Sequence, residues 1–138
     1  MKAILIDPEA KLIHDIEFDG DYREISRTIG CDLFTVVQLD RVNCVYVDDE
    51  GLLNSPRYFF IHEDYPQPLA GKGLVLGVDD EGETIGTTLE VADLAKKVKF
   101  TELSVLGFEE SEGVTERYGQ EMNFIRSVPV FGPPEEKE

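Results

Sequence analysis

The feature of the sequence that most suggests chemistry is a repeated pentapeptide, Val-Asp-Asp-Glu-Gly, at 47–51 and again at 78–82. Carboxylate oxygens are the ligands that Mg²⁺ and Ca²⁺ prefer, so two such loops could hold a hard cation. An EF-hand, however, places its acids at alternating positions and adds a distant bidentate Glu, whereas these acids are consecutive and their side chains would diverge. We therefore interpret both copies as polar turns after strands, each with its glycine in the left-handed αL region. The sequence predicts no metal site and no cofactor.

A second candidate is His62, because Glu63 and Asp64 follow it and a histidine beside carboxylates could act as a general acid or base. Adjacent loop residues rarely point at one another, however. The chain also has neither a Gly-x-Ser-x-Gly nucleophile motif nor the His-x-Glu and Pro-Cys-x-x-Cys signature of zinc deaminases. The glycines around Lys72 lack the spacing of a Walker A loop. These patterns favour a protein without catalytic residues; the alternative is a small divalent-metal-dependent enzyme that combines His62 with the acidic turns.

The two cysteines, Cys31 and Cys44, are too few for a secreted disulfide scaffold. Together with His14 and His62 they match no familiar zinc spacing. We interpret both as small buried apolar residues. No apolar run is long enough to span a membrane and no signal peptide opens the chain, so we expect a cytoplasmic protein.

Negative charge is the dominant character of the chain. Its 138 residues contain 29 Asp and Glu against 13 Lys and Arg, a formal net charge of -16. This sign works against direct binding to nucleic acid and against docking on anionic membranes. The acids are spread along the whole chain, and such a surface attracts basic proteins. Three explanations remain open: carboxylates that take the place of phosphates on a DNA-binding protein, adaptation to high salt, or an acidic domain that is merely soluble.

Short apolar runs predict a domain rich in β-strands. Met1–Ile6 and Lys11–Phe18 flank an Asp-Pro turn and predict an N-terminal hairpin. In the three consecutive aromatics at 58–60, neighbouring rings must lie on opposite sides of a strand. We expect these rings to pack in the core, although one could be covered by the Pro-rich loop at 65–71 or serve as a partner anchor. Four more strands are predicted in the middle of the chain, at Leu33–Leu39, Cys44–Val47, Arg57–Ile61 and Gly73–Val78.

Two helices are predicted between these strands. Apolar residues at helical spacing over 22–29, with Gly30 after them, indicate a short amphipathic helix. Thr87 and Glu90 form a capping box, which predicts that a second helix covers the apolar positions 89–98 and ends on lysines. Mainly antiparallel strands with two helices define an α+β fold. A hairpin, a helix and then further strands is also the element order of a β-grasp.

The C-terminal part of the sequence is harder to interpret. Phe100–Phe108 predicts a further strand and 109–113 a solvated break. The stretch from Val114 to Ile125 is compatible with a short helix that Gly119 weakens. The chain is accordingly divided into a globular α+β domain, a partly ordered extension and a disordered acidic tail, at 1–108, 109–131 and 132–138.

Three segments carry a resemblance to a known family: Met1–Pro8, Tyr46–Leu53 and Pro66–Gly77. As a set they resemble a domain-of-unknown-function family of small proteins found in phages, plasmids and integrative elements. The resemblance leaves out the segment from Phe108 onward. It implies no catalytic residues, and it implies genomic neighbours that include antirestriction genes.

We therefore expect a non-enzymatic accessory protein of a phage or mobile element that binds a basic surface of a host protein. In its narrower form, the protein mimics nucleic acid and inhibits a restriction or CRISPR-type defence system. A structural subunit, whose Phe and Tyr faces form an oligomer, is a further alternative. The predicted partner-binding residues are the acids of the two turns, Asp48, Asp49, Glu50, Asp79, Asp80, Glu81 and Glu83.

Overall fold

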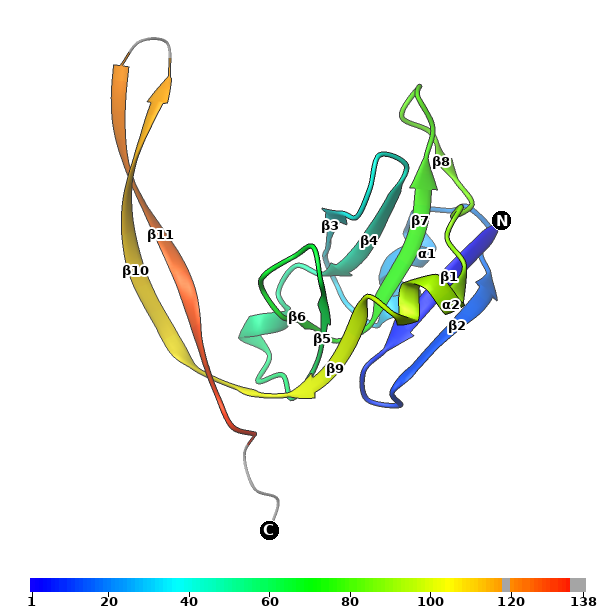
Figure 1. The fold of residues 1–138 in the computed structure, drawn as a ribbon, viewed down its shortest axis with the longest axis horizontal. Helices are drawn as coiled ribbons and strands as arrows, with labels where there is room; N and C mark the ends of the chain where they lie inside the picture. Colours follow the sequence, from blue (N-terminus) through cyan, green and yellow to red (C-terminus); the bar gives the residue numbers. More distant parts are fainter. Residues whose placement is uncertain (118–119, 135–138) are drawn as a thin grey trace.

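The computed structural model in Figure 1 describes residues 1–117 and 120–134. Short runs within the first 85 residues form a six-stranded sheet. The strand order is β2-β1-β7-β4-β3, with β8 beside the end of β7, and every pairing is antiparallel. The predicted hairpin and three of the four predicted middle strands are confirmed in this sheet. Its strands are β1 (Lys2–Asp7), β2 (Leu12–Glu17), β3 (Phe34–Gln38), β4 (Asn43–Asp48), β7 (Gly73–Val78) and β8 (Thr84–Ile85).

One face of this sheet is covered by helix α1 (Arg23–Ile29). Ile25 and Ile29 are buried in a cluster with apolar residues of β1, β4 and β7. Gly30 ends the helix in the αL region with φ 73°, where a side chain would be strained. The predicted helix is confirmed, but Tyr22 precedes it and is 70% exposed, so this ring does not join the apolar face.

The opposite face is covered by a second sheet of order β6-β5-β9. Its strands are β5 (Tyr58–His62), β6 (Leu69–Ala70) and β9 (Val98–Glu102). Phe60 packs toward the first sheet in the main core cluster. Phe59 lies on the other side of β5 and meets Phe131 edge to face, with ring centroids 5.6 Å apart. The expectation that these rings pack in the core is confirmed for Phe59 and Phe60, whereas Tyr58 is only partly buried. The domain has three layers: α1, the first sheet, and the second sheet with helix α2 (Val91–Ala95).

The predicted start of α2 is wrong. Glu90, not Thr87, is the N-cap, and no side chain bonds the first turn. Thr87 is buried, and its Oγ1 donates instead to Oδ1 of Asn43 at 2.7 Å. The same Oγ1 accepts the backbone N–H of Leu89 at 3.2 Å, so Thr87 closes a local turn before the helix and also satisfies the buried Asn43 amide. The helix is five residues long, and Val98 belongs to β9.

The solvated break and the short helix expected after Phe108 are also wrong. Strand β10 (Ser104–Arg117) runs through 109–113 without interruption and pairs with β11 (Gln120–Gly132). The far end of the resulting hairpin extends away from the layered domain in Figure 1, while its base contacts the domain through Phe131. Glu109 and Glu110 point to opposite faces of β10 and are both exposed. Both faces of the hairpin therefore tolerate the polar residues that suggested a break. Of the predicted tail, Gly132 ends β11 and residues 135–138 lie outside the described residues.

Candidate functional site

The first acidic turn follows β4 and leads into a single turn of 3-10 helix, η1 (Gly51–Leu53). Oδ1 of Asp48 accepts the backbone N–H of Glu50 at 2.9 Å. The N–H of Asp49 donates to the carbonyl of Leu33 at 2.9 Å and so ties the turn to the start of β3. Gly51 is buried, and a Cβ there would lie 3.1 Å from Cβ of Ala70. The αL conformation predicted for Gly51 is wrong, because its φ is not positive; here the glycine relieves a tight contact with Ala70.

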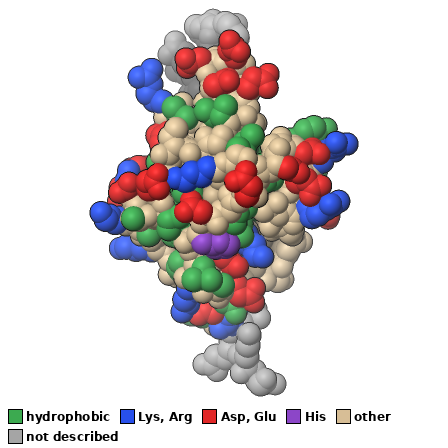
Figure 2. All heavy atoms as spheres, turned by 90° about the vertical axis from the view of Figure 1, so that its right-hand side faces the viewer, with side chains coloured by type: hydrophobic (Ala, Val, Ile, Leu, Met, Phe, Trp, Pro, Cys, Tyr) green, Lys and Arg blue, Asp and Glu red, His purple; other side chains and the backbone are tan. Residues whose placement is uncertain are grey.

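The second acidic turn joins β7 to β8. Oδ1 of Asp79 accepts two backbone N–H groups, from Glu81 and from Glu83, each at 2.9 Å. Gly82 has φ 82°, which confirms the αL glycine predicted for this copy. The side chains of Asp80, Glu81 and Glu83 are exposed. Figure 2 shows acidic side chains gathered at the upper end of its face, where the β7–β8 turn lies in Figure 1.

The structure does not bring the two turns together. Since β4 and β7 are antiparallel, each turn follows the carboxyl end of its strand at an opposite end of the sheet. Gly77 pairs with Asn43, so Asp79 is level with Arg41. Asp48 lies seven positions further along β4, about 24 Å away at a rise of about 3.4 Å per residue. The seven predicted acids therefore form two separate groups.

His62 belongs to neither group. It is buried in β5, and its Nδ1 accepts the backbone N–H of Asp64 at 3.1 Å. It lines a hollow of about 120 Å³ together with Asp40, Asp93 and Lys97. None of the turn acids lines this hollow. Within the described residues, no group of three His, Cys, Asp or Glu side chains is arranged to hold a metal ion.

Asp40, an acid that the sequence analysis did not single out, organises the loop between β3 and β4. Its Oδ1 accepts the backbone N–H groups of Val42 and Asn43, at 2.8 and 2.7 Å, and the Asn43 side-chain amide at 3.1 Å. Burial raises the pKa of Asp40, but the hydrogen bonds from Asn43 and Val42 outweigh it, so the pKa lies below its usual range. The Asn43 amide also donates to Oγ1 of Thr88 at 2.8 Å, which connects this loop to the segment before α2.

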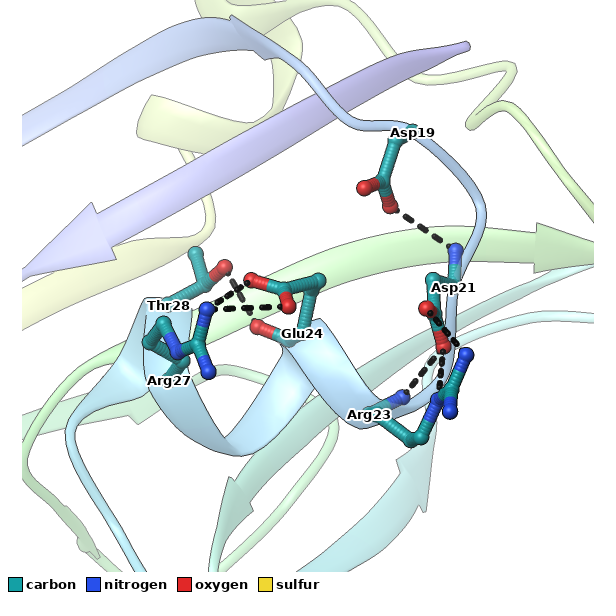
Figure 3. A network of polar contacts seen from close by, with 6 residues as sticks. All are labelled: Asp19, Asp21, Arg23, Glu24, Arg27 and Thr28. Carbon is teal, nitrogen blue, oxygen red and sulfur yellow. Dashed lines mark hydrogen bonds and ion pairs between the residues drawn. The ribbon is translucent and has the colours of Figure 1, made fainter.

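Two acids at α1, Asp21 and Glu24, are paired with cations (Figure 3), unlike the acids of the turns. Arg23 donates to both carboxylate oxygens of Asp21 at 3.1 Å, and its side-chain hydrogen bond lowers the pKa of Asp21. Arg27 makes an ion pair with Glu24 at 3.1 Å. Across 1–117 and 120–134, by comparison, no ion pair involves an acid of either turn.

Exposed apolar side chains lie next to the first turn, and the sequence analysis missed them. Leu33 is 58% exposed, Val36 is 48% exposed and Leu53 is 68% exposed. The carbonyl of Leu33 accepts the backbone N–H of Asp49. Leu53 is the last residue of η1, which follows the acidic turn. A strand such as β3 reads the same whether it lies inside a sheet or at its edge, so only the strand order reveals this exposure.

The two cysteines, Cys31 and Cys44, are weakly nucleophilic thiols. Cys44 is buried beneath α1 and Cys31 is half-buried at its end, and both thiols are free. Burial raises the pKa of each thiol, which keeps it protonated and a weak nucleophile. The interpretation as small buried apolar residues is confirmed for Cys44 and holds in part for Cys31. No described helix is long and apolar enough to cross a bilayer.

Comparison with known proteins extends these observations. Residues 1–99 match the family model described as a domain of unknown function, DUF3846. The uncharacterized protein y4iR of Sinorhizobium fredii is 31% identical over 99 residues, which cover 70% of this chain and 62% of that protein. Protein PsiB of Rhizobium leguminosarum bv. phaseoli is 30% identical over 73 residues, 53% of this chain and 54% of that protein.

The matched region thus spans less than two thirds of either relative, and no solved structure matches the chain. The family match lies within the layered domain, and the β10–β11 hairpin is outside it. Because the family model covers most of the chain, the protein belongs to the DUF3846 family.

Proposed function

We propose that the protein is a non-enzymatic binding protein whose partner presents a basic protein surface. The observation that carries this proposal is the contrast between acids. Asp21 and Glu24 have cationic partners, whereas the exposed acids of both turns have no ion-pair partner in the described part of the chain. Carboxylates held by a defined turn and left unpaired are available to cations on another molecule.

The physical consequence is a strong dependence on salt. Exposed charges interact over about 8 Å at physiological ionic strength, and added salt shortens this range. Acidic groups at two ends of the sheet would raise the association rate with a basic partner more than they would add to the final affinity. The exposed Leu33, Val36 and Leu53 offer the apolar contacts that hold a complex together after the encounter.

In its narrower form, the proposal makes this an accessory protein of a phage or mobile element. Its partner would then be a nucleic-acid-binding protein of a host defence system, and the turn carboxylates would take the place of phosphates. The charge of -16 supports a partner of this kind, because nucleic-acid-binding surfaces are strongly basic. The separation of the turns limits the mimicry to two short groups of carboxylates.

The test uses purified basic nucleic-acid-binding proteins, including a restriction endonuclease and a CRISPR effector, each loaded with a fluorescent DNA duplex. We expect the protein to bind at least one of them at low salt and to lose most of that binding at about 0.3 M salt. Release of the duplex supports the narrower form. Binding to none of them at low salt contradicts the proposal.

Charge variants show whether the turns are responsible. Asp80→Asn, Glu81→Gln and Glu83→Gln together should weaken binding several-fold. The matched control neutralises three exposed acids elsewhere, with Glu9→Gln, Asp15→Asn and Asp64→Asn. Equal weakening by both sets would mean that only the net charge acts, and would contradict a role for the turns.

A metal-dependent enzyme is the rival from another class, and the geometry does not favour it, because neither turn approaches His62. Titration with Mg²⁺, Mn²⁺ and Ca²⁺, followed by calorimetry, separates the two ideas. We expect no tight stoichiometric binding. A tight site that is lost on Asp79→Asn would favour the enzyme and contradict the proposal.

A further inference from the structure

The outer edge of the first sheet is unusual at β3. In the part of the chain that the structure describes, β3 pairs with β4 on one side and with no strand on the other. Its sequence, Phe-Thr-Val-Val-Gln, contains no charge and no proline. Edge strands normally carry charged residues or proline, because an open, uncharged strand is a template for pairing with another chain. The opposite edge strand, β2, follows that rule with exposed His14, Asp15 and Glu17.

The register defines which backbone groups of β3 are open. Asp49 donates to the carbonyl of Leu33, and Leu39 donates to the carbonyl of Asn43. Residues directly opposite each other alternate between hydrogen-bonded and non-bonded pairs, so Thr35 and Val37 bond to β4. The alternate residues of β3 are Phe34, Val36 and Gln38. Their backbone N–H and C=O groups point away from β4, toward the open edge of the sheet.

The side chains around this edge make it a better docking site than the other edges of the fold. Leu33 and Val36 are about half exposed and flank the open backbone groups. In the second sheet, β6 has only two residues, and the outer strand β9 carries the exposed Lys99. The first sheet therefore has one edge that is blunted by charge and one that is ready to accept a strand.

The charges at the beginning of β3 select the strand that can be added. Asp32, Asp49 and Glu50 are exposed there, whereas the other end of β3 carries Asp40 next to the exposed cation Arg41. In a second copy paired antiparallel about Val36, Asp32 would lie level with Asp40 of the other copy. Arg41 offsets part of the repulsion in these two pairs, but the charge of -16 on each chain opposes self-association. A strand with Lys or Arg at the end beside Asp32, Asp49 and Glu50 would be attracted there.

We propose that β3 binds an extended segment of another protein by β-strand addition, and that this segment has an uncharged, β-branched centre and basic residues at the end beside the first acidic turn. This inference rests on the proposed function, since it names the way in which the basic partner is held. The backbone of Phe34, Val36 and Gln38 supplies the hydrogen bonds. Leu33 and Val36 supply the apolar contact, and the first acidic turn pairs with the basic end.

The probe is the acetylated, amidated peptide Lys-Lys-Val-Thr-Val-Thr-Val-Lys-Lys. Its control has Pro in place of the central Val, so it keeps the charge but cannot complete the ladder. We expect the control to bind about tenfold more weakly, because it forfeits hydrogen bonds whose loss together amounts to about 1.4 kcal/mol. Amide hydrogen exchange should slow at Phe34, Val36 and Gln38 when the first peptide binds. It should change little at Thr35 and Val37, which are already bonded.

A variant of the protein provides the reciprocal test. Val36→Pro removes an outward N–H that bonds to nothing in the sheet, and Val36→Ala is its matched control. We expect Val36→Pro to bind the two peptides equally weakly. Val36→Ala should still bind the first peptide more tightly than its Pro control. Circular dichroism checks that both variants fold. If Val36→Pro does not fold, the comparison of the two peptides on the wild-type protein still tests strand addition.

Equal binding of the two peptides, with no slowed exchange along β3, would overturn strand addition while leaving the salt-dependent binding of basic proteins intact. Failure of both peptides and of every basic protein would overturn the proposed function as well. A dimer that protects the same amides and dissociates on Val36→Pro would replace the basic segment with a second copy as the occupant.

Discussion

The two copies of Val-Asp-Asp-Glu-Gly have the same sequence and different structural roles. In both, the first Asp accepts the N–H two residues later, so this local hydrogen bond follows from the sequence. The glycines differ, because Gly51 is packed against Ala70 and Gly82 adopts the αL region in open space. The surroundings differ too: one copy adjoins the open edge of β3, and the other is the tip of the β7–β8 turn. The repeat therefore encodes a turn, and the sheet decides what the turn does.

The largest effect on stability is expected at the two glycines. Gly51→Ala places a Cβ against Ala70, whose own Cβ cannot rotate away, and should cost about 2 kcal/mol of unfolding free energy. Gly82→Ala meets no neighbour and should cost about 1 kcal/mol through backbone strain. Urea denaturation measures both.

Two controls separate the causes. Adding Ala70→Gly should recover part of the loss in Gly51→Ala, and Gly82→Asn should be nearly neutral because Asn tolerates αL. Equal costs at both glycines, with no rescue, would show that the two turns are equivalent after all.

The next effect is expected at the first Asp of each copy. Asp79→Ala removes an acceptor from two N–H groups and should cost about 1 kcal/mol, whereas Asp48→Ala removes one and should cost about half of that. Thermal unfolding at neutral pH gives the comparison. A larger loss for Asp48→Ala would mean that its role lies in contacts other than this hydrogen bond.

Asp40 extends the comparison to an acid whose lowered pKa links its contacts to pH. A carboxyl whose folded-state pKa is lowered stabilises the protein above its unfolded pKa of about 3.9, and this contribution disappears as the pH falls through the folded-state pKa. The loss of stability on acidification below about pH 4 should therefore be shallower in Asp40→Asn than in the wild type. Urea midpoints measured between about pH 5 and pH 3 test this, and parallel curves would contradict it.

Much of the layered domain was predictable from local patterns. Periodicity located the N-terminal hairpin, α1 and the strands β3, β4, β5 and β7, because each buries apolar residues; β6 lies in the predicted Pro-rich loop. The start of α2 was not predictable, since Thr87 accepts the N–H of Leu89 in a turn before the helix and is buried against Asn43, which lies far away in the sequence. The long hairpin was missed because its exposed strands tolerate residues such as Glu109 and Glu110 that elsewhere indicate a break.

The candidate site was predictable only in part. The acids and their turns follow from the sequence, but their separation depends on the antiparallel pairing of β4 and β7. The open edge of β3 depends on strand order, which no local pattern reports. Leu33 and Val36 consequently looked like ordinary strand residues.

The most direct test compares binding kinetics of the lysine-flanked peptide with two matched variants, Asp49→Asn with Glu50→Gln and Asp80→Asn with Glu81→Gln. The first pair lies beside β3, so its loss should speed dissociation several-fold; the second pair lies at the far end of the sheet, so its loss should slow association and change dissociation less than about twofold. Urea denaturation should show both variants as stable as the wild type within about 0.5 kcal/mol. Identical kinetic changes in the two variants, or none in either, would contradict the account.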